Sequence, residues 1–217
     1  MTYIYLIRHC EAVGNLKRVF QGSTDCDISE TGAKQLEFLK ERFKNIKLDA
    51  IYSSPLIRAR KTAEAVVCGK GLEIITRQNL TELSGGVVEG RPFQEAFNSI
   101  PGLADTWNNH PQDFAPEGGE AMRHAYVRIY DEITDLVNQN RGKTIAVTSH
   151  GGVLRCLMCR VLYGDITRLC DVPWCENTAV TLLKIDDDNK INIEFFNDHS
   201  HVPPEYMPKR SRIVSKA

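Results

Sequence analysis

The segment from Tyr3 to His9, YIYLIRH, constrains the fold of this chain more than any other stretch. Its five consecutive apolar residues, mostly aromatic or β-branched, are typical of a strand buried on both faces inside a parallel sheet. Ligands of open α/β sheets bind at the carboxyl ends of the strands, which is where Arg8 and His9 fall. A guanidinium can clamp an oxyanion, and an imidazole can carry a proton or attack as a nucleophile. The pair therefore indicates a phosphate site.

A second segment repeats this arrangement. Residues 143–152, KTIAVTSHGG, have a basic start, an apolar β run, His150 at its carboxyl end and then two glycines before an apolar helical pattern. If the two strands are neighbours in a parallel sheet, about 4.8 Å apart, His9 and His150 emerge side by side at one edge. The sequence thus predicts two imidazoles in one pocket.

The remaining pattern predicts a three-layer α/β/α fold with a mostly parallel central sheet and one antiparallel edge strand. A helix is expected from about residue 30 with Ser29 as its N-cap, and another from Ser54 (N-cap) and Pro55 (N1) to about Val67. Asp186–Asn189 separates two apolar runs and predicts an antiparallel hairpin. The other expected elements are strands over 49–53 and 72–76, a loop over 10–28, a loop over 80–90 that holds Glu82, and helices over about 120–140 and 151–162.

The helix that begins near Ser54 matters for an anion site, because a helix N-terminus presents free N–H groups and positive potential. Arg58 lies one turn into this helix and can lean towards the sheet edge. Arg60 points about 200° away around the helix and is expected to be a solvated or structural residue. Arg58 is therefore the preferred ligand.

A chain of 217 residues is expected to form a single domain over residues 1–217, with a cap-like insertion over about 91–118 that holds one short helix near 93–99. The tail over about 203–217 is polar and basic, and we expect it to be disordered. Four aromatic residues of the insertion either line an apolar cap or only anchor the insertion. These residues are Phe93, Phe97, Trp107 and Phe114.

The net charge of −1 gives no global field that would attract nucleic acid or a membrane surface, so any attraction for an anion must be local. The seven cysteines lack the dense spacing of a small secreted domain, and reduced thiols in the cytoplasm are the expectation. We expect no signal sequence and no membrane span. A homodimer is left open.

Four motifs in this order resemble the histidine phosphatase superfamily, which includes the cofactor-dependent phosphoglycerate mutases, over nearly the whole chain. The motifs are LIRH over 6–9 with Asn15 following, SSPLIRARKTA over 53–63, LTEL over 80–83 leading to Glu89 and Gly90, and SHGG over 149–152. The resemblance implies a metal-independent phosphomonoester hydrolase, without a cofactor, that acts on a small phosphorylated metabolite through a phosphohistidine.

The resemblance and the chemistry together assign roles to residues. A phosphomonoester needs cationic donors, an in-line nucleophile and an acid for the leaving oxygen. We expect His9 to be the nucleophile, with its proton affinity lowered by the two arginines, and Glu82 to be the acid and then the base, which gives an acid-to-neutral pH optimum. Arg8, Arg58 and His150 would hold the phosphoryl oxygens. Asn15, Gln21, Gly22 and Gly151 are expected substrate-binding residues on the family pattern, with less weight on Asn15 and the Gln21-Gly22 pair.

Cys10 departs from the family pattern, in which glycine is common after the histidine. Its side chain would crowd the pocket or place a thiol beside the nucleophile. Cysteine catalysis is a weak alternative, because Leu16 stands where a cysteine-dependent phosphatase needs its arginine. Six other cysteines and histidines could be zinc ligands, but burial in the hydrophobic core is the favoured interpretation for them. These residues are Cys156, Cys159, Cys170, Cys175, His199 and His201.

Two further functions stay open. The mutases of the family have extra basic residues that bind a second phosphate. Here the segment between Gly90 and Glu120 has few basic side chains, namely Arg91 and His110. A phosphatase is therefore preferred over phosphoglycerate mutase-type phosphoryl transfer. A non-catalytic module that binds phospho-ligands is the alternative from another class, although it predicts the loss of a catalytic group.

Overall fold

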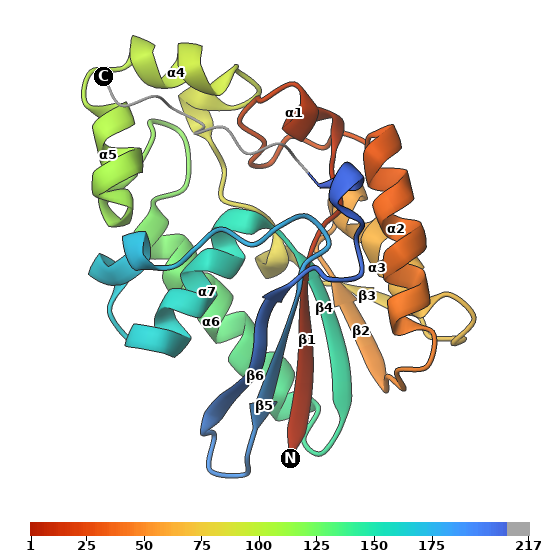
Figure 1. Ribbon diagram of the computed structural model, residues 1–217. Helices are drawn as coiled ribbons and strands as arrows, with labels where there is room; N and C mark the ends of the chain where they lie inside the picture. Colours follow the sequence, from red (N-terminus) through yellow and green to blue (C-terminus); the bar gives the residue numbers. More distant parts are fainter. Residues whose placement is uncertain (208–217) are drawn as a thin grey trace.

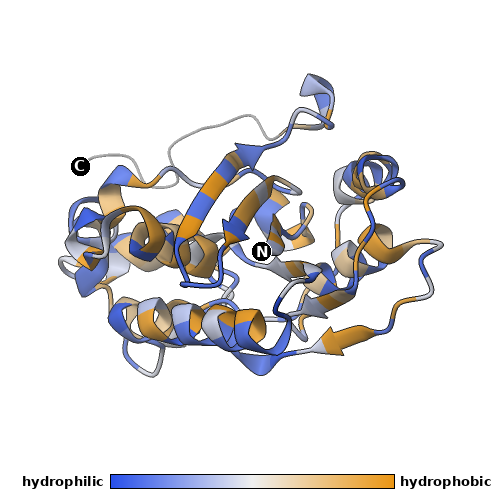
Figure 2. Cartoon of the chain, turned by 90° about the horizontal axis from the view of Figure 1, so that it is seen from below, coloured by the Kyte–Doolittle hydropathy of each residue, from blue (hydrophilic) through white to orange (hydrophobic). Residues whose placement is uncertain are grey.

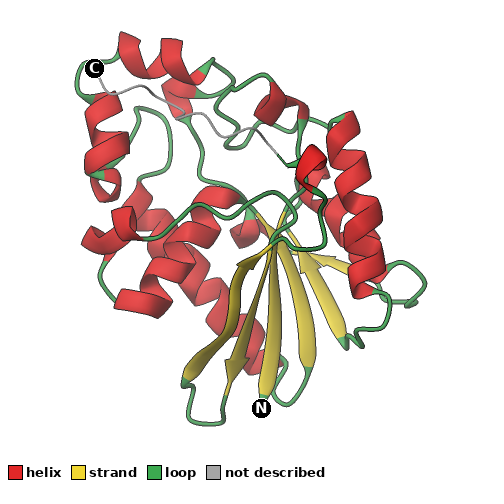
Figure 3. Ribbon diagram, in the orientation of Figure 1, coloured by secondary structure: helices red, strands yellow, loops and turns green. Residues whose placement is uncertain are grey.

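The computed structural model describes residues 1–207, which form one six-stranded sheet between helical layers (Figure 1). The strand order is β3-β2-β4-β1-β5-β6, in which β5 alone runs against β1 and the hairpin β5-β6 closes one edge (Figure 3). The expected α/β fold with an antiparallel strand near its edge is confirmed. The strands are β1 (Thr2–Arg8), β2 (Ala50–Ser53), β3 (Ile74–Thr76), β4 (Thr144–Ser149), β5 (Val180–Ile185) and β6 (Ile191–Asp198).

The strands β1 and β4 are parallel neighbours, as the sequence predicted. Their register pairs Tyr3 with Thr144 and Arg8 with Ser149. The residues that follow this last pair are His9 and His150, so hydrogen bonding within the sheet brings the two histidines to the same edge.

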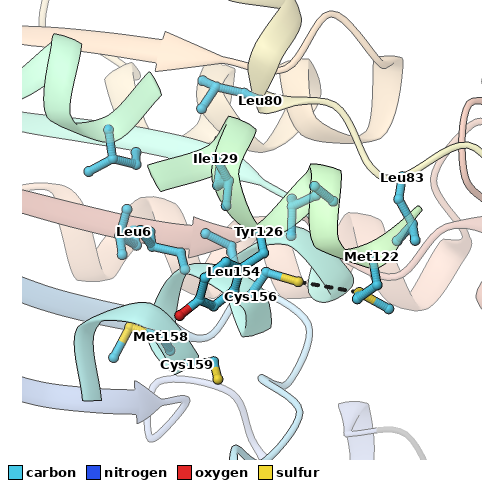
Figure 4. Packing of buried hydrophobic residues seen from close by; sticks show 14 of the residues in the cluster. Leu6, Leu80, Leu83, Met122, Tyr126, Ile129, Leu154, Cys156, Met158 and Cys159 are labelled. Carbon is cyan, nitrogen blue, oxygen red and sulfur yellow. Dashed lines mark hydrogen bonds between the residues drawn. The ribbon is translucent and has the colours of Figure 1, made fainter. Parts of the chain in front are cut away.

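Two hydrophobic layers hold the sheet, because alternate residues of a strand face opposite sides. Ile4 and Leu6 of β1 pack into the larger core with α6 (Met122–Gln139) and α7 (Gly151–Tyr163), whereas Ile7 packs with α2 (Glu30–Phe43) and α3 (Ile57–Val67). Figure 4 shows the larger core, where the Cys156 thiol lies against the sulfur of Met122. Figure 2 shows hydrophobic and hydrophilic colours alternating along strands and on the surrounding helices, as expected for elements that bury one face.

The five helices that the sequence predicted are present with shifted boundaries, whereas the short helices over 13–16 and 103–109 were not expected. Ser29 caps the helix after it, since its hydroxyl oxygen accepts from the N–H of Gly32 at 3.0 Å. The helix expected from Ser54 begins later, at Ile57, so Pro55 is not its first residue. The helices are α1 (Val13–Leu16), α2 (Glu30–Phe43), α3 (Ile57–Val67), α4 (Phe93–Ser99), α5 (Leu103–Asn109), α6 (Met122–Gln139) and α7 (Gly151–Tyr163), with short 3₁₀ turns between them.

The cap insertion holds two helices, α4 and α5, where the sequence indicated one. Its aromatic residues are packed against one another, with ring centroids 5.9 Å apart for Phe97 and Phe114 and 4.8 Å apart for Trp107 and Phe114. Phe20, from the loop after β1, adds a ring to the same cluster at 6.1 Å from Phe114. Because these rings are buried, they anchor the cap to the body of the protein.

The tail is more ordered than the sequence indicated. Residues 203–207 include a 3₁₀ turn, and the main-chain oxygen of Tyr206 accepts from the side chain of the buried Gln35 at 2.8 Å. The expected disorder of 203–207 is therefore wrong, while the expectation for 208–217 lies outside the described residues. Within residues 1–207, no helix is both long enough and apolar enough to cross a bilayer.

Candidate active site

His9 directly follows β1 and is 4% exposed. Its Nδ1 atom lies 2.6 Å from the carbonyl oxygen of Cys10, and since a carbonyl only accepts, Nδ1 carries the ring proton. Burial holds the pKa of His9 well below its usual range, and the charges of Arg58 and Arg8 add to this effect. The ring is thus neutral with a lone pair on Nε2. The sequence indicated the effect of the arginines but not that of burial, the larger cause.

His150 is the N-cap residue of α7, and its ring centroid lies 5.1 Å from that of His9. Its Nε2 atom is 2.7 Å from the hydroxyl of Ser54, which also accepts from the N–H of Leu56. We assign the tautomer in which the Ser54 hydroxyl donates to Nε2 and the ring proton is on Nδ1, the nitrogen that has no partner within the described residues. Burial, followed by the charges of Arg58, His9 and Arg8, holds the pKa of His150 well below its usual range.

Arg58 is fully buried in the first turn of α3. Main-chain oxygens of the loop after β1 hold its guanidinium, at 2.7 Å from Thr24, 3.0 Å from Gly22 and 3.3 Å from Gln21. Arg60 is exposed, as expected. Burial lowers the pKa of Arg58. The loop therefore fixes a cation at the sheet edge without neutralising it.

Arg8 is fixed from the other side of the site. Its Nη1 atom donates to the main-chain oxygen of Cys175 at 2.5 Å. A Cβ atom on Gly151 would lie 3.2 Å from Arg8 Nε, so the absence of a side chain at position 151 lets the guanidinium approach the start of α7. In the structure Gly151 packs against Arg8, and its predicted contact with substrate stays a prediction.

Three buried nitrogen atoms around His9 have no hydrogen-bond partner within residues 1–207: Arg8 Nε, Arg58 Nε and His150 Nδ1. Buried donors are nearly always bonded, so an unbonded set indicates where a ligand acceptor belongs. The three atoms come from the ends of β1 and β4 and from α3. A tetrahedral oxyanion offers enough acceptors for all three.

Glu82 lies against the first turn of α7. Its carboxyl oxygens accept from the N–H groups of Gly152 at 2.8 Å, Leu83 at 3.0 Å and Val153 at 3.1 Å. Burial raises the pKa of Glu82, although these hydrogen bonds and the charges of Arg58 and Arg8 oppose the rise. A carboxyl group with a raised pKa beside two arginines is suited to giving and taking a proton near neutral pH.

Asn15 lies in α1, and Gln21 and Gly22 lie in the loop after it, which holds Arg58. The side-chain oxygen of Asn15 accepts from the N–H of Ala12 at 2.9 Å, and that of Gln21 accepts from the thiol of Cys26 at 2.6 Å. Gly22 and Gln21 face Arg58 through their main-chain oxygens. The structure thus shows these residues shaping the loop, and a direct contact with substrate stays a prediction.

Sequence reasoning missed several residues that contact the site. Ser54 was interpreted as an N-cap, but its hydroxyl contacts His150. Thr62 and Asn177 contact the backbone after β1, and Cys175 contacts Arg8. A signal was present in the polar run ENT over 176–178 immediately before the apolar β5. Because β5 is antiparallel to β1, its amino end lies at the carboxyl edge of β1.

A pocket of about 530 Å³ opens beside Glu82. Its wall includes Gln78, Ser84, His124 and Arg128. The cation among these, Arg128, donates to both carboxyl oxygens of Glu120 at 2.7 and 2.6 Å and to the main-chain oxygens of residues 79 and 81. The wall thus carries polar groups beside the apolar Pro55 and Leu56, and the charge of its arginine is compensated.

The sequence and the fold of this chain are similar to those of known proteins. Residues 4–199 match the model of the histidine phosphatase superfamily (branch 1). The chain is 28% identical over 213 residues to phosphoserine phosphatase 1 of Hydrogenobacter thermophilus, covering 98% of this chain and 100% of the relative. It is 32% identical over 203 residues to phosphoglycerate mutase-like protein 4 of Arabidopsis thaliana, covering 92% and 86%. The structure of Bacillus stearothermophilus YhfR superposes with a TM-score of 0.87 at 29% identity, covering 93% and 99%.

The chain belongs to the histidine phosphatase superfamily. It is an enzyme of the phosphomonoesterase type. The fold and the general reaction that the sequence indicated are confirmed.

The unusual cysteine of this histidine phosphatase does not crowd the site. Cys10 is fully buried, and its sulfur faces α2, where a Cβ atom on Gly32 would lie 3.4 Å away. Burial raises the pKa of Cys10 to about 12, which keeps the thiol protonated and unreactive. The expectation of a crowded pocket is therefore wrong, and the geometry disfavours cysteine catalysis.

The other cysteines and histidines of this histidine phosphatase are dispersed. Cys156 and Cys159 are buried in the core side of α7, whereas Cys170 is exposed. His201 lies beside Arg42, 3.0 Å from its Nη1 atom. Over residues 1–207, no group of three or more His, Cys, Asp or Glu side chains is arranged to hold a metal ion.

Proposed function

We propose that this protein hydrolyses small phosphomonoesters through a phosphohistidine on His9. The observation that supports this most directly is the pairing of β1 with β4, which places the neutral rings of His9 and His150 5.1 Å apart among buried, partly unbonded arginine nitrogens. His9 would attack, while Arg8, Arg58 and the Nδ1–H of His150 would hold the phosphoryl oxygens, whose negative charge grows in the transition state.

The first step forms a bond from His9 Nε2 to phosphorus and breaks the bond from phosphorus to the ester oxygen. Protonated Glu82 gives its proton to that oxygen, and the alcohol leaves. In the second step the Glu82 carboxylate takes a proton from a water molecule as the water oxygen attacks phosphorus. The N–P bond breaks, its electron pair returns to Nε2, and inorganic phosphate leaves. Glu82 ends protonated, ready for the next cycle.

The test uses p-nitrophenyl phosphate, assayed with and without EDTA, followed by mapping of the acid-labile phosphoryl adduct. We expect hydrolysis that EDTA does not change and an adduct on His9. The variant His9→Ala should lose at least 10³-fold in kcat, as an order-of-magnitude expectation for removing a nucleophile. Binding of phosphate without hydrolysis would favour the non-catalytic module, and an adduct on any other residue would refute the mechanism.

The leaving group is proposed to occupy the pocket beside Glu82. Its wall offers hydroxyl, amide and imidazole groups, and the charge of Arg128 is already compensated by Glu120. A carboxylate on the leaving group would therefore lack a free cation there, whereas hydroxyl groups would find partners. Arg91, in the cap, is likewise engaged, by Glu95 and Ser99. Both observations favour phosphatase activity on hydroxyl-rich esters over mutase activity on phosphoglycerates.

A substrate panel tests this assignment. Polyol and sugar phosphates should exceed phosphoserine and 3-phosphoglycerate in kcat/KM by about 10-fold or more, since a tenfold preference corresponds to about 1.4 kcal/mol. Ser84→Ala and Gln78→Ala should lower kcat/KM for the polyol esters but leave p-nitrophenyl phosphate within about threefold. A preference for the carboxylate-bearing esters would refute the assignment of the leaving group without affecting the role of His9.

A further inference from the structure

The peptide group that joins His9 to Cys10 is held from both sides by buried side chains. Its carbonyl oxygen, on His9, accepts from the side-chain amide of Asn177 at 2.9 Å. Its N–H, on Cys10, donates to the hydroxyl of Thr62 at 3.1 Å. Asn177 precedes β5 and Thr62 lies in α3, so two elements distant in the chain meet at one peptide plane.

This peptide plane controls where the imidazole of His9 points. The ring is tied by Nδ1 to the next carbonyl, that of Cys10, at 2.6 Å. That carbonyl belongs to the next peptide group, whose N–H, on Glu11, donates to the side-chain oxygen of Gln35 at 2.8 Å. A displacement of the His9–Cys10 peptide would shift the Cα atom of Cys10 and the carbonyl attached to it, and the ring would follow or lose its hydrogen bond. The direction of Nε2, the atom that must face phosphorus in line with the leaving oxygen, is thus set by the backbone.

Thr62, and Thr178 next to Asn177, are themselves held by buried contacts. The Thr62 hydroxyl donates to the main-chain oxygen of Arg58 at 2.7 Å, and Thr62 and Thr178 are fully buried. Thr178 has φ of +58°, a left-handed conformation that is rare for a β-branched residue. In this conformation its N–H contacts the main-chain oxygens of Arg8 at 3.1 Å and His9 at 3.4 Å. Backbone strain of this kind persists where the surroundings impose it, often beside functional groups.

The same loop is anchored on its outer side. The side-chain oxygen of Asn197, in β6, accepts from the N–H of Glu176 at 2.8 Å, and Asn197 also has a left-handed φ, of +55°. The main-chain oxygen of Cys175, one residue earlier, accepts from Arg8. The segment from Cys175 to Thr178 therefore links the β5-β6 hairpin to both Arg8 and His9.

We propose that Asn177 and Thr62 are positioning residues, which clamp the His9–Cys10 peptide and so aim the nucleophilic nitrogen at phosphorus. The proposal rests on the role of His9 given above. It predicts that loss of either clamp slows phosphoryl transfer to His9 while the groups that bind phosphate stay in place.

The test measures, for Asn177→Ala and Thr62→Val, the kcat for p-nitrophenyl phosphate, the rate of adduct formation, the inhibition constant of inorganic phosphate and the thermal midpoint. We expect each variant to lose about 10- to 100-fold in kcat and in adduct formation, the scale that a small misplacement of a reacting group produces. The phosphate inhibition constant should stay within about threefold, because Arg8, Arg58 and His150 are retained. Thr62→Ser, which keeps the hydroxyl, should restore kcat to within about threefold of the wild type.

The matched control is Asn140→Ala. Asn140 is buried like Asn177, at 2% against 3% exposed, and donates to Tyr52 and Leu136, but it lies at the end of α6, before β4 begins. We expect it to lower the thermal midpoint with kcat unchanged. The double variant Asn177→Ala with Thr62→Val should lose less than the product of the single losses, because both clamps act on one peptide.

Two results would overturn the proposal. One is a kcat within twofold of the wild type in both Thr62→Val and Asn177→Ala. The other is a loss of kcat matched by an equal loss of phosphate affinity, which would indicate general disturbance of the site. If Asn177→Ala does not fold, the comparison of Thr62→Val with Thr62→Ser decides alone. Failure of the wild type to form an adduct on His9 would instead refute the proposed function.

Discussion

Replacement of Glu82 by glutamine separates the two proton transfers assigned to that residue. Glutamine has nearly the same shape and keeps one acceptor oxygen, but it cannot give or take a proton. In the wild type the carboxyl group faces three backbone N–H groups, from Leu83, Gly152 and Val153. The glutamine NH₂ would face one or two of these donors, so we expect a loss of about 1–3 kcal/mol in the free energy of unfolding.

The effect on turnover should be larger and should depend on the leaving group. General acid catalysis contributes about 10²- to 10⁴-fold, or about 3–5 kcal/mol, when the leaving oxygen is basic. Glycerol phosphate releases a basic alkoxide, so Glu82→Gln should lose this full factor in its first step. p-Nitrophenyl phosphate releases a stable phenolate without protonation. Its first step should therefore stay fast while the second step, which needs the base, becomes slow.

Rapid-mixing kinetics at mildly acidic pH provides the assay. Glu82→Gln should release about one equivalent of p-nitrophenol per active site in a burst, followed by slow turnover, and should show no burst with an alkyl ester. In the wild type, kcat should fall as pH rises through the raised pKa of Glu82, and this limb should vanish in the variant. Glu132→Gln is the control, since Glu132 is also buried but contacts Arg77 and Asn79. Equal, small losses for both kinds of ester would refute the role of Glu82.

Three further predictions follow from particular contacts. Gly152→Ala would place a Cβ atom 2.7 Å from a carboxyl oxygen of Glu82, so kcat should fall about tenfold or more and the free energy of unfolding by about 1–3 kcal/mol, as measured by kinetics and urea unfolding. Cys10→Ser should keep kcat within about threefold, and thiol reagents should not inhibit the native wild type, because the pKa of Cys10 is raised to about 12; complete loss of activity in this variant would revive cysteine catalysis. Burial, followed by the charge of Arg42, lowers the pKa of His201 from 6.5 to about 4, so the unfolded chain binds more protons in this range and stability should fall as pH drops from 6.5 to 4. His9 and His150, whose pKa values are also lowered, contribute a slope of the same sign, so His201→Gln should make the slope in urea titrations smaller without abolishing it, and an unchanged slope would contradict the reasoning.

The strands β1 and β4 were predictable because a strand that is buried on both faces consists of a continuous apolar run. The position of His9 and His150 followed from the rule that parallel strands present their carboxyl ends at one edge. Arg58 followed from its place near a helix start, although that helix begins at Ile57 rather than beside Pro55. In each case the signal was local, a periodicity or a polar residue at its end.

The contacts of Ser54, Thr62 and Asn177 could not be predicted in this way, because the residues near them in the chain contain no pattern that indicates their partners. Asn177 reaches His9 across 168 positions, and only the antiparallel direction of β5 brings it there. The same holds for the aromatic rings of the cap, whose composition is compatible with an open pocket or with a packed anchor. In the structure the rings pack against one another, and they therefore form the anchor.

The sequence by itself determined which groups of this protein can do chemistry: two histidines and an arginine at strand ends, a second arginine at a helix start and a glutamate in a loop. Only the tertiary structure decided their protonation and their aim. The pKa values of His9, His150 and Glu82 are shifted first by burial, a property of the whole packed chain. The direction of the His9 ring depends on hydrogen bonds from α3 and from the segment before β5, which meet only when the sheet is complete.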